Sequence, residues 1–255
     1  MTERSAVVGI HAVRTALKFG ADGVTELWLD RQRRDRRFAD LITLARAAAI
    51  PVHTLERSQL DQAAPATNHQ GVLAWVRVPA ARNEAELAPL IANSPSPALV
   101  LVLDGITDPH NLGACLRTAE AVGATAVVAP RDQAVGLTPA AVKVASGAAH
   151  TMPFIQVTNL ARTLEALKQQ GLWIFGTQME APTTLFANDL RSPLALVLGS
   201  EGKGLRPLTV RHCDVLMQLP MSGAVESLNV SVTAGICLYE VWRQRQTLSQ
   251  GAAGA

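Results

Sequence analysis

An unbroken apolar run, LVLVLDGI at residues 99–106, constrains the fold of this chain more than any other feature. A strand of this composition has to be buried on both faces, because it has no alternating polar positions to present to water. Such strands occur in parallel sheets whose crossover helices cover both faces. Similar runs, with helical patterns between most of them, follow at 125–130, 153–157, 171–177, 194–199 and 215–220. This part of the chain therefore predicts an α/β fold with a mostly parallel sheet flanked by helices.

The first part of the chain shows a shorter alternation of strand-like and helix-like segments. Helical patterns cover 11–20 and 36–49, and Gly20 is placed to end the first of them. Strand patterns occur at 7–10, 25–29, 51–55 and 72–78. Residues 1–78 therefore predict a small α/β domain that is separate from the larger sheet.

The segment 79–98 lies between these two regions and contains four prolines. Because proline favours extended and semi-rigid chain, we expect the interdomain linker here, with a short helical piece from Glu84 to Ile91. The second domain is then expected over 99–246, closed by a long helix that starts near Ser227. Residues 247–255 are expected to form a disordered tail.

Composition excludes several classes of protein. The 255 residues carry a formal net charge of only +2, so bulk charge does not mark the chain as a nucleic-acid binder. No apolar run approaches the roughly 20 residues of a membrane-spanning helix, and no secretory signal is evident. The cysteines Cys115, Cys213 and Cys237 form no CxxC pair, which argues against a disulfide framework or a zinc site. These features fit a protein of the reducing cytoplasm.

Local charge is more informative than net charge. Five arginines fall within the seven residues RQRRDRR at 31–37. Such a patch suits phosphate binding, since each neutralised phosphate releases a counterion. A solvated loop and helix start explains the same residues, and the sequence leaves both interpretations open.

Ligands of parallel α/β sheets bind at the carboxyl ends of the strands, so the loops that follow the strands deserve inspection. The first, at 104–124, has Asp108 before Pro109, a pairing typical of a helix start. Asn111 falls at that helix N-terminus, and Arg117 follows within two turns. Together they can hold an anionic or hydroxyl-rich substrate, although a capped surface helix would look the same.

The second loop, at 196–208, places Glu201 among three glycines directly after a buried strand. Gly199, Gly202 and Gly204 allow the backbone to approach a ligand closely. Their G-x-x-G-x-G spacing matches neither a P-loop nor the dinucleotide fingerprint. An ordinary tight turn is the competing explanation.

The third loop follows the strand that ends at Leu219. Ser227 is expected to cap the last helix, with Asn229 in its first turn. A stripe of Leu228, Val232, Ile236 and Tyr239 is expected to pack that helix onto the sheet.

Taken in order, the three loops resemble the sequence motifs of a known enzyme family. The patterns DxxxDPxNxGxxxRTAxxxGA, GSEGxGL and LPMxGxxxSLNVSxxxGICLYE are similar to those of the SpoU-type (TrmH-like) branch of the SPOUT methyltransferases. The likeness extends over 99–246. The stretches VVGIHAVRTAL and NHQGVLA also resemble the ribosomal-protein L30e-like RNA-binding domain of one bacterial subfamily, which methylates a guanosine 2′-hydroxyl in the peptidyl-transferase centre of 23S rRNA.

The resemblance implies a fold and partners that spacing alone does not. A C-terminal trefoil knot is expected, although knots are rare among protein folds. The family implies a homodimer with its site near the subunit interface, an rRNA substrate and S-adenosylmethionine as the methyl donor. Cofactor contacts carry over to Thr177, Gly199, Leu219 and Leu228.

Five polar positions of the family site are matched without departure, and they are Asn111, Arg117, Glu201, Ser227 and Asn229. The implied reaction is an in-line displacement in which the donor supplies a reactive methyl group and the protein supplies alignment. No metal is required. The family mechanism makes Arg117 the base, but a guanidinium does not deprotonate in proteins, so we expect Arg117 to stabilise developing negative charge.

Three other interpretations compete with this one. The first is a tRNA ribose methyltransferase of the same family, which the L30e-like front end disfavours. The second is a catalytically silent RNA-binding module, which the intact Asn111, Arg117, Glu201 and Asn229 disfavour. A nucleotide-dependent oxidoreductase is excluded, because no GxGxxG follows the first strand. The sequence does not identify the nucleotide that is methylated or the proton acceptor.

Overall fold

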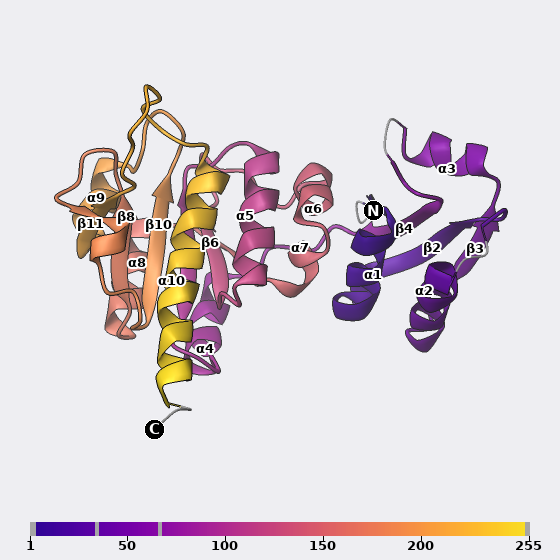
Figure 1. Cartoon of the computed structure of the whole chain (residues 1–255), viewed down its shortest axis with the longest axis horizontal. Helices are drawn as coiled ribbons and strands as arrows, with labels where there is room; N and C mark the ends of the chain where they lie inside the picture. The colour runs from indigo at the N-terminus through magenta and orange to yellow at the C-terminus, as the bar shows by residue number, and fades with distance from the viewer. Residues whose placement is uncertain (1–3, 34–35, 66–67, 253–255) are drawn as a thin grey trace. The chain divides into compact units, whose positions relative to one another are not determined.

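The computed structural model describes residues 4–33, 36–65 and 68–252 of the chain (Figure 1). It divides into two compact units, one formed by Met1–Ala80 and Leu137–Thr151, the other by Ala81–Gly136 and Met152–Ala255. Each unit has its own sheet.

The first unit is built on a four-stranded sheet with the order β1-β4-β2-β3. Its strands are β1 (Arg4–Val8), β2 (Val24–Asp30), β3 (Val52–Leu55) and β4 (Val72–Arg77). Among these described strands, β2 and β3 alone pair in parallel. The helices of this unit are α1 (Ile10–Phe19), η1 (Ala21–Gly23), α2 (Arg36–Ala47), α3 (Arg57–Ala63), α6 (Pro139–Ala145) and α7 (Ala148–Thr151).

Three features of this unit differ from the prediction. Residues 137–151, which we expected in the second domain, belong to this unit. The first strand ends at Val8, two residues before the predicted end, because Gly9 adopts a φ of 90° and turns the chain into α1. The helix α3 was not predicted. Leu60 is its one buried residue among those described, so its seven residues carry no helical apolar repeat for sequence reasoning to detect.

The second unit contains a seven-stranded sheet with the order β7-β6-β5-β10-β8-β11-β9, and all of its pairings are parallel. This confirms the predicted α/β class with a parallel sheet. The strands are β5 (Leu99–Asp104), β6 (Ala126–Pro130), β7 (Phe154–Val157), β8 (Trp173–Thr177), β9 (Thr183–Thr184), β10 (Leu194–Gly199) and β11 (Val215–Gln218).

Helices cover this sheet and complete its core. They are η2 (Glu84–Glu86), α4 (Leu87–Ala92), α5 (Pro109–Ala121), α8 (Leu160–Gln169), η3 (Leu185–Ala187), α9 (Pro207–His212) and α10 (Val230–Ala252). Every residue of β5 is buried, as the unbroken apolar run predicts. The expected helical piece of the linker is confirmed as η2 and α4, and Leu87 packs into the core of this unit.

The order of the strands positions the candidate site. The strand β10 lies between β5 and β8, both of which precede it in the chain, and β11 lies on the far side of β8. The carboxyl ends of β5, β10, β8 and β11 are therefore neighbours along one edge. The last helix, α10, then returns to pack against α5 and β10 (Figure 1). The trefoil knot expected from the resemblance stays a prediction.

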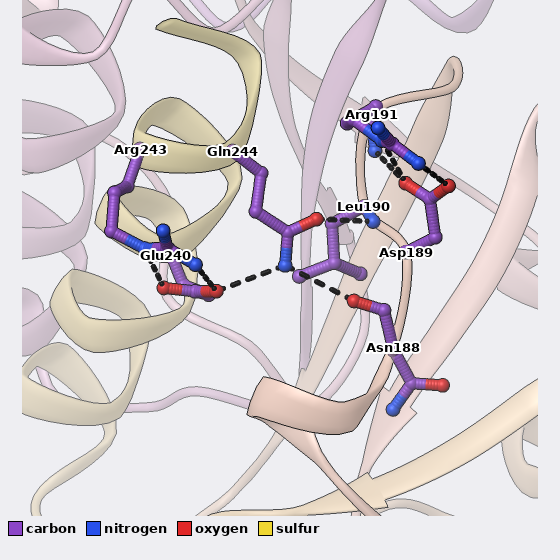
Figure 2. A network of polar contacts seen from close by, with 7 residues as sticks. All are labelled: Asn188, Asp189, Leu190, Arg191, Glu240, Arg243 and Gln244. Carbon is purple, nitrogen blue, oxygen red and sulfur yellow. Dashed lines mark hydrogen bonds and ion pairs between the residues drawn. The ribbon is translucent and has the colours of Figure 1, made fainter. Parts of the chain in front are cut away.

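Polar contacts fasten the distal half of α10 to the loop before β10 (Figure 2). The Gln244 amide accepts a hydrogen bond from the Leu190 N–H at 2.8 Å and donates to the Asn188 carbonyl at 3.0 Å. It also donates to Glu240 at 2.9 Å. Hydrogen bonds from Arg243 lower the pKa of the Glu240 carboxyl. At the next residue of the helix, the Arg245 guanidinium donates to carbonyl groups that precede β5 and β10.

The end of α10 differs from the prediction. The helix continues to Ala252, through most of the segment 247–255 for which we expected disorder. Extending an existing helix adds a hydrogen bond for each residue fixed, which is far easier than starting one. The rest of the expected tail, 253–255, lies outside the described residues. None of the helices in the described part of the chain is long and apolar enough to cross a bilayer.

Replacing Gln244 with Ala tests the fastening of α10. The change leaves the Leu190 N–H without its partner, so we expect the free energy of unfolding to fall by roughly 1–3 kcal/mol. Gln246→Ala is the matched control, because Gln246 is exposed on the same helix. Urea unfolding curves for both variants measure the difference. Equal midpoints for the two variants would contradict the role assigned to Gln244.

Candidate functional site

A tight turn follows β10 and forms one wall of the candidate site. Its two ends are tied together, since Ser200 and Gly204 exchange backbone hydrogen bonds of 3.2 and 2.9 Å. Gly199 lies directly beneath this crossing. A Cβ added at Gly199 would lie 2.0 Å from the Gly204 carbonyl carbon, so only glycine fits there. Gly199 thus serves the tight turn, which is the competing explanation of this loop, and the turn also borders a cavity.

A buried carboxylate holds the far end of this turn. Asp104, at the end of β5, is 1% exposed and accepts hydrogen bonds from the Arg206 backbone N–H at 3.1 Å and from its Nε at 2.5 Å. Sequence reasoning missed this pair. A signal was present, because Asp104 is the one charged residue at the end of an otherwise apolar strand, and buried carboxylates require a partner.

Glu201 joins three loops that are far apart in the sequence. Its Oε1 accepts hydrogen bonds from Asn111 Nδ2 at 3.2 Å, from Asn229 Nδ2 at 2.7 Å and from the Val230 backbone N–H at 3.2 Å. The Asn229 amide also donates to Asn111 Oδ1 at 3.0 Å. The starts of α5 and α10 and the turn after β10 therefore meet at a single carboxylate oxygen.

The caps of the two helices explain how the asparagines are presented. Asp108 accepts a hydrogen bond from the His110 N–H at 2.9 Å, which confirms the predicted start of α5. The predicted cap of the last helix is wrong. The helix α10 begins at Val230, and Asn229 Oδ1 accepts from the Ser231 N–H at 2.9 Å. Ser227 lies in the loop that precedes α10, because Asn229 and not Ser227 caps the helix.

A cavity of about 370 Å³ opens beside this cluster, at the carboxyl ends of β8, β10 and β11. A cavity of this volume is large enough for a small organic ligand. Among the residues that border it are Glu201, Ser227 and all four positions expected to contact the cofactor, which are Thr177, Gly199, Leu219 and Leu228.

The charge and surface of the cavity define what it can hold. Three carboxylates, those of Glu180, Glu201 and Glu226, border it against one cation, Lys203. Leucine and methionine side chains supply apolar surface beside them. The combination suits a ligand with a flat apolar part and positive charge, which are the properties of an adenosyl sulfonium.

Arg117 is not brought to this cluster within one chain. It is exposed on α5 and does not border the cavity, and within the described ranges no hydrogen bond or ion pair of its side chain is found. It follows Asn111 by six residues, which is about 240° around a helix, so the two side chains leave α5 on different sides.

The predicted apolar stripe of the last helix faces the wrong way. The side that packs inward carries Val230, Ala234, Cys237, Leu238 and Val241. Val232 and Tyr239 of the predicted stripe are instead 49% and 50% exposed, beside Trp242 at 43%. The helix has apolar residues on two sides, and periodicity alone does not say which side meets the core.

Within the part of the chain that the structure describes, neither the cysteines nor a cluster of metal-ligating residues forms a second reactive site. Burial raises the pKa of the Cys115 and Cys237 thiols to about 12, so neither is a thiolate near neutral pH. No group of three histidine, cysteine, aspartate or glutamate residues able to hold a metal occurs among the residues described.

The fold and the site define a class of protein. A parallel sheet with a ligand cavity over the turns at the ends of adjacent strands is the architecture of an α/β enzyme that binds a nucleotide-sized molecule. Family comparison narrows the class. Residues 98–239 match the SpoU rRNA methylase family, and residues 6–80 match the RNA 2′-O ribose methyltransferase substrate-binding domain. The chain therefore belongs to the SpoU rRNA methylase family.

Relatives resemble the chain over nearly its whole length. The 23S rRNA (guanosine-2′-O-)-methyltransferase RlmB of Pseudomonas putida is 48% identical over 96% of this chain and 99% of its own. The RlmB of Nitrosomonas europaea is 50% identical over 96% and 93%. A crystal structure of an RNA 2′-O ribose methyltransferase matches 96% of this chain and 90% of its own, with a TM-score of 0.76 and 27% identity.

Replacing Gly199 with Ala tests whether the turn after β10 shapes the cavity. The added Cβ would collide with the Gly204–Leu205 backbone, so the turn has to open and we expect binding of S-adenosylmethionine to be lost. Gly223→Ala is the control, because Gly223 lies in the third loop with open space around the added atom. Titration calorimetry measures both variants. Normal affinity in Gly199→Ala would show that the turn takes no part in the site.

Proposed function

We propose that this protein transfers a methyl group from S-adenosylmethionine to the ribose 2′-hydroxyl of a guanosine in 23S rRNA, in the peptidyl-transferase centre. The observation that carries this proposal is the likeness of 47–50% identity to 23S rRNA (guanosine-2′-O-)-methyltransferases over at least 94% of the chain. The joined Asn111, Glu201 and Asn229 beside a cavity support an active enzyme over a silent RNA-binding module.

The cavity fits the donor that family membership implies. Two solved structures that share this fold contain AdoMet. One is the SpoU methyltransferase AviRb of Streptomyces viridochromogenes, at 23% identity, and the other is an rRNA methyltransferase of Sinorhizobium meliloti, at 20% identity. Here Leu219 and Leu228 border the cavity with apolar surface. Gly199 borders it without a side chain, and Thr177 borders it at the end of β8. When bound, the donor supplies an electrophilic methyl group.

The residues of the chain then have to align the ribose hydroxyl and manage charge. Asn111 and Asn229 hold Glu201 at the edge of the cavity, and Ser227 borders the same space as a hydroxyl able to bind the ribose. Arg117 is a permanent cation with five donors, which suits it to hold a phosphate of the RNA and to stabilise negative charge on the attacking oxygen.

A homodimer accounts for two otherwise unexplained features. Val232, Tyr239 and Trp242 expose a large apolar stripe along α10, and exposed apolar surface of this kind marks interaction sites. Arg117 also lies outside the cavity of its own chain. Pairing of two chains through α10 would cover the stripe and give a partner's Arg117 access to the site, as family membership implies.

Residues 1–78, which belong to the first unit, are proposed to form the L30e-like domain that binds the RNA. Its match to the substrate-binding family supports this assignment. Within the arginine run, Arg31 pairs with Glu56 at 3.1 Å and Arg33 donates to the Gln70 carbonyl at 2.6 Å, so part of the run is structural. Arg36 is exposed on α2 and suits a phosphate contact. Arg34 and Asp35 lie outside the described residues.

A tRNA substrate is the alternative within the family. A solved TrmH/SpoU tRNA-modifying enzyme of A. aeolicus is 28% identical but covers only 65% of this chain, with a TM-score of 0.56. The rRNA assignment is supported because the 23S rRNA enzymes match both units. With rRNA as its substrate, the protein is proposed to work in the cytoplasm.

Incubation of the purified protein with 23S rRNA and S-adenosylmethionine tests the proposed function. We expect one new methyl group, located by mass spectrometry on the 2′-oxygen of a guanosine in the peptidyl-transferase centre. A methyl group on a base, or modification of tRNA in preference to 23S rRNA, would contradict the proposal.

Arg117→Ala tests the proposed electrostatic role. Turnover should fall by about 10²- to 10³-fold, in the range found when a group that stabilises transition-state charge is removed. Donor affinity should stay the same, because Arg117 does not border the cavity. Arg117→Lys keeps the charge and should keep measurable activity, whereas a role specific to the guanidinium predicts that lysine is as inactive as alanine. Near-normal turnover in Arg117→Ala would remove this residue from the mechanism.

A further inference from the structure

The hydrogen bonds of Glu201 are distributed unequally between its two oxygens. Oε1 accepts all three of the contacts made with Asn111, Asn229 and the Val230 backbone N–H. Oε2 has no hydrogen-bond or ion-pair partner in the part of the chain that the structure describes. Three donors on Oε1 hold the carboxylate in one plane, and this fixes the orientation of Oε2.

The free oxygen is also accessible to a substrate. Glu201 borders the cavity, and its side chain is exposed. A carboxylate that served only to join the loops would gain from using both oxygens, since an ionised carboxylate offers about four acceptor positions. The arrangement instead leaves one oriented anionic acceptor at the edge of the cavity.

The other groups near the cavity cannot play the same part. The Asn229 carbonyl oxygen already accepts from the Ser231 N–H and hydroxyl, at 2.9 and 2.6 Å. The Asn111 carbonyl oxygen accepts from Asn229. Arg117 has no acceptor at all. Glu180 and Glu226 border the cavity as anions, but within the described ranges no hydrogen bond orients either of them.

We propose that Glu201 is the proton acceptor of the reaction and that its Oε2 takes the proton of the ribose 2′-hydroxyl, an inference that rests on the proposed function. The ribose oxygen forms a bond to the methyl carbon as its O–H bond breaks, and the electrons of the carbon–sulfur bond remain on sulfur. A carboxylate and a sulfonium thus become a carboxylic acid and a neutral thioether. The proton passes to water after the products leave.

A carboxylate is a sufficient base for this step. The hydroxyl proton becomes strongly acidic as the new carbon–oxygen bond forms, so the acceptor needs position more than high basicity. The acceptor also carries the charge that the reaction consumes, because the anion and the cation are neutralised together. Asn111 and Asn229 are positioning residues in this account, since they act through Glu201.

Glu201→Gln separates this role from a structural one. Glutamine has the same shape, and its single oxygen can still accept from the three donors, while an amide nitrogen replaces the free oxygen. We expect the single-turnover rate of methyl transfer to fall by about 10²- to 10⁴-fold, the usual contribution of general base catalysis. Glu201→Ala should lose at least as much.

Binding supplies the readout that is independent of activity. Calorimetry should give the same affinity for S-adenosylmethionine in Glu201→Gln as in the natural protein, and the melting temperature should be unchanged. Glu120→Gln is the control for the loss of one negative charge, because Glu120 is exposed on α5 away from the cavity. Its rate should match that of the natural protein.

Each outcome bears on a different claim. If glutamine restores the rate that alanine loses, Glu201 only joins the loops and the inference is overturned. Loss of donor affinity in Glu201→Gln would also overturn it, because Glu201 would then serve binding. If the natural protein transfers no methyl group to RNA ribose, the proposed function fails, whatever the variants do.

Discussion

The structure of the site depends on three hydrogen bonds to one carboxylate oxygen. Asn111, Glu201 and Asn229 come from loops that are 28 to 118 residues apart, and nothing local in the sequence holds them together. Such a cluster exists only because β10 inserts between β5 and β8, which brings the loop ends to one edge of the sheet. The buried Asp104 then holds the turn after β10 through Arg206, so the turn and the cluster share one rigid base.

Local patterns predict the elements of this fold but not their order. The buried strands are evident from apolar runs such as 99–106 and 194–199, because burial on both faces leaves a clear composition. The position of β10 between two earlier strands depends on pairing across the whole unit, which no window of sequence contains. Short helices such as α3 are not predicted for a different reason, since a single buried leucine gives no helical repeat of apolar residues.

The site was predictable to a similar extent. The resemblance to the family predicted the residues that border the cavity and the cluster of Asn111, Glu201 and Asn229. The contact between Asp104 and Arg206 was found only in the structure, because the two residues are 102 apart in the sequence. The outward stripe of Val232 and Tyr239 was placed on the wrong side, since the period of a helix does not reveal which of two apolar sides meets the core. That exposed apolar side is the observation that most supports the proposed homodimer.

The central claim is that the loops after β8, β10 and β11 form one donor site, in which Glu201 joins the turn after β10 to the loop that precedes α10. Hydrogen exchange of the backbone amides, measured with and without S-adenosylmethionine, tests it most directly. The account predicts that the donor slows exchange together in the loop that follows Thr177, the turn that follows Gly199 and the loop that precedes α10. Protection confined to one of these loops, or located in the first unit, would contradict it.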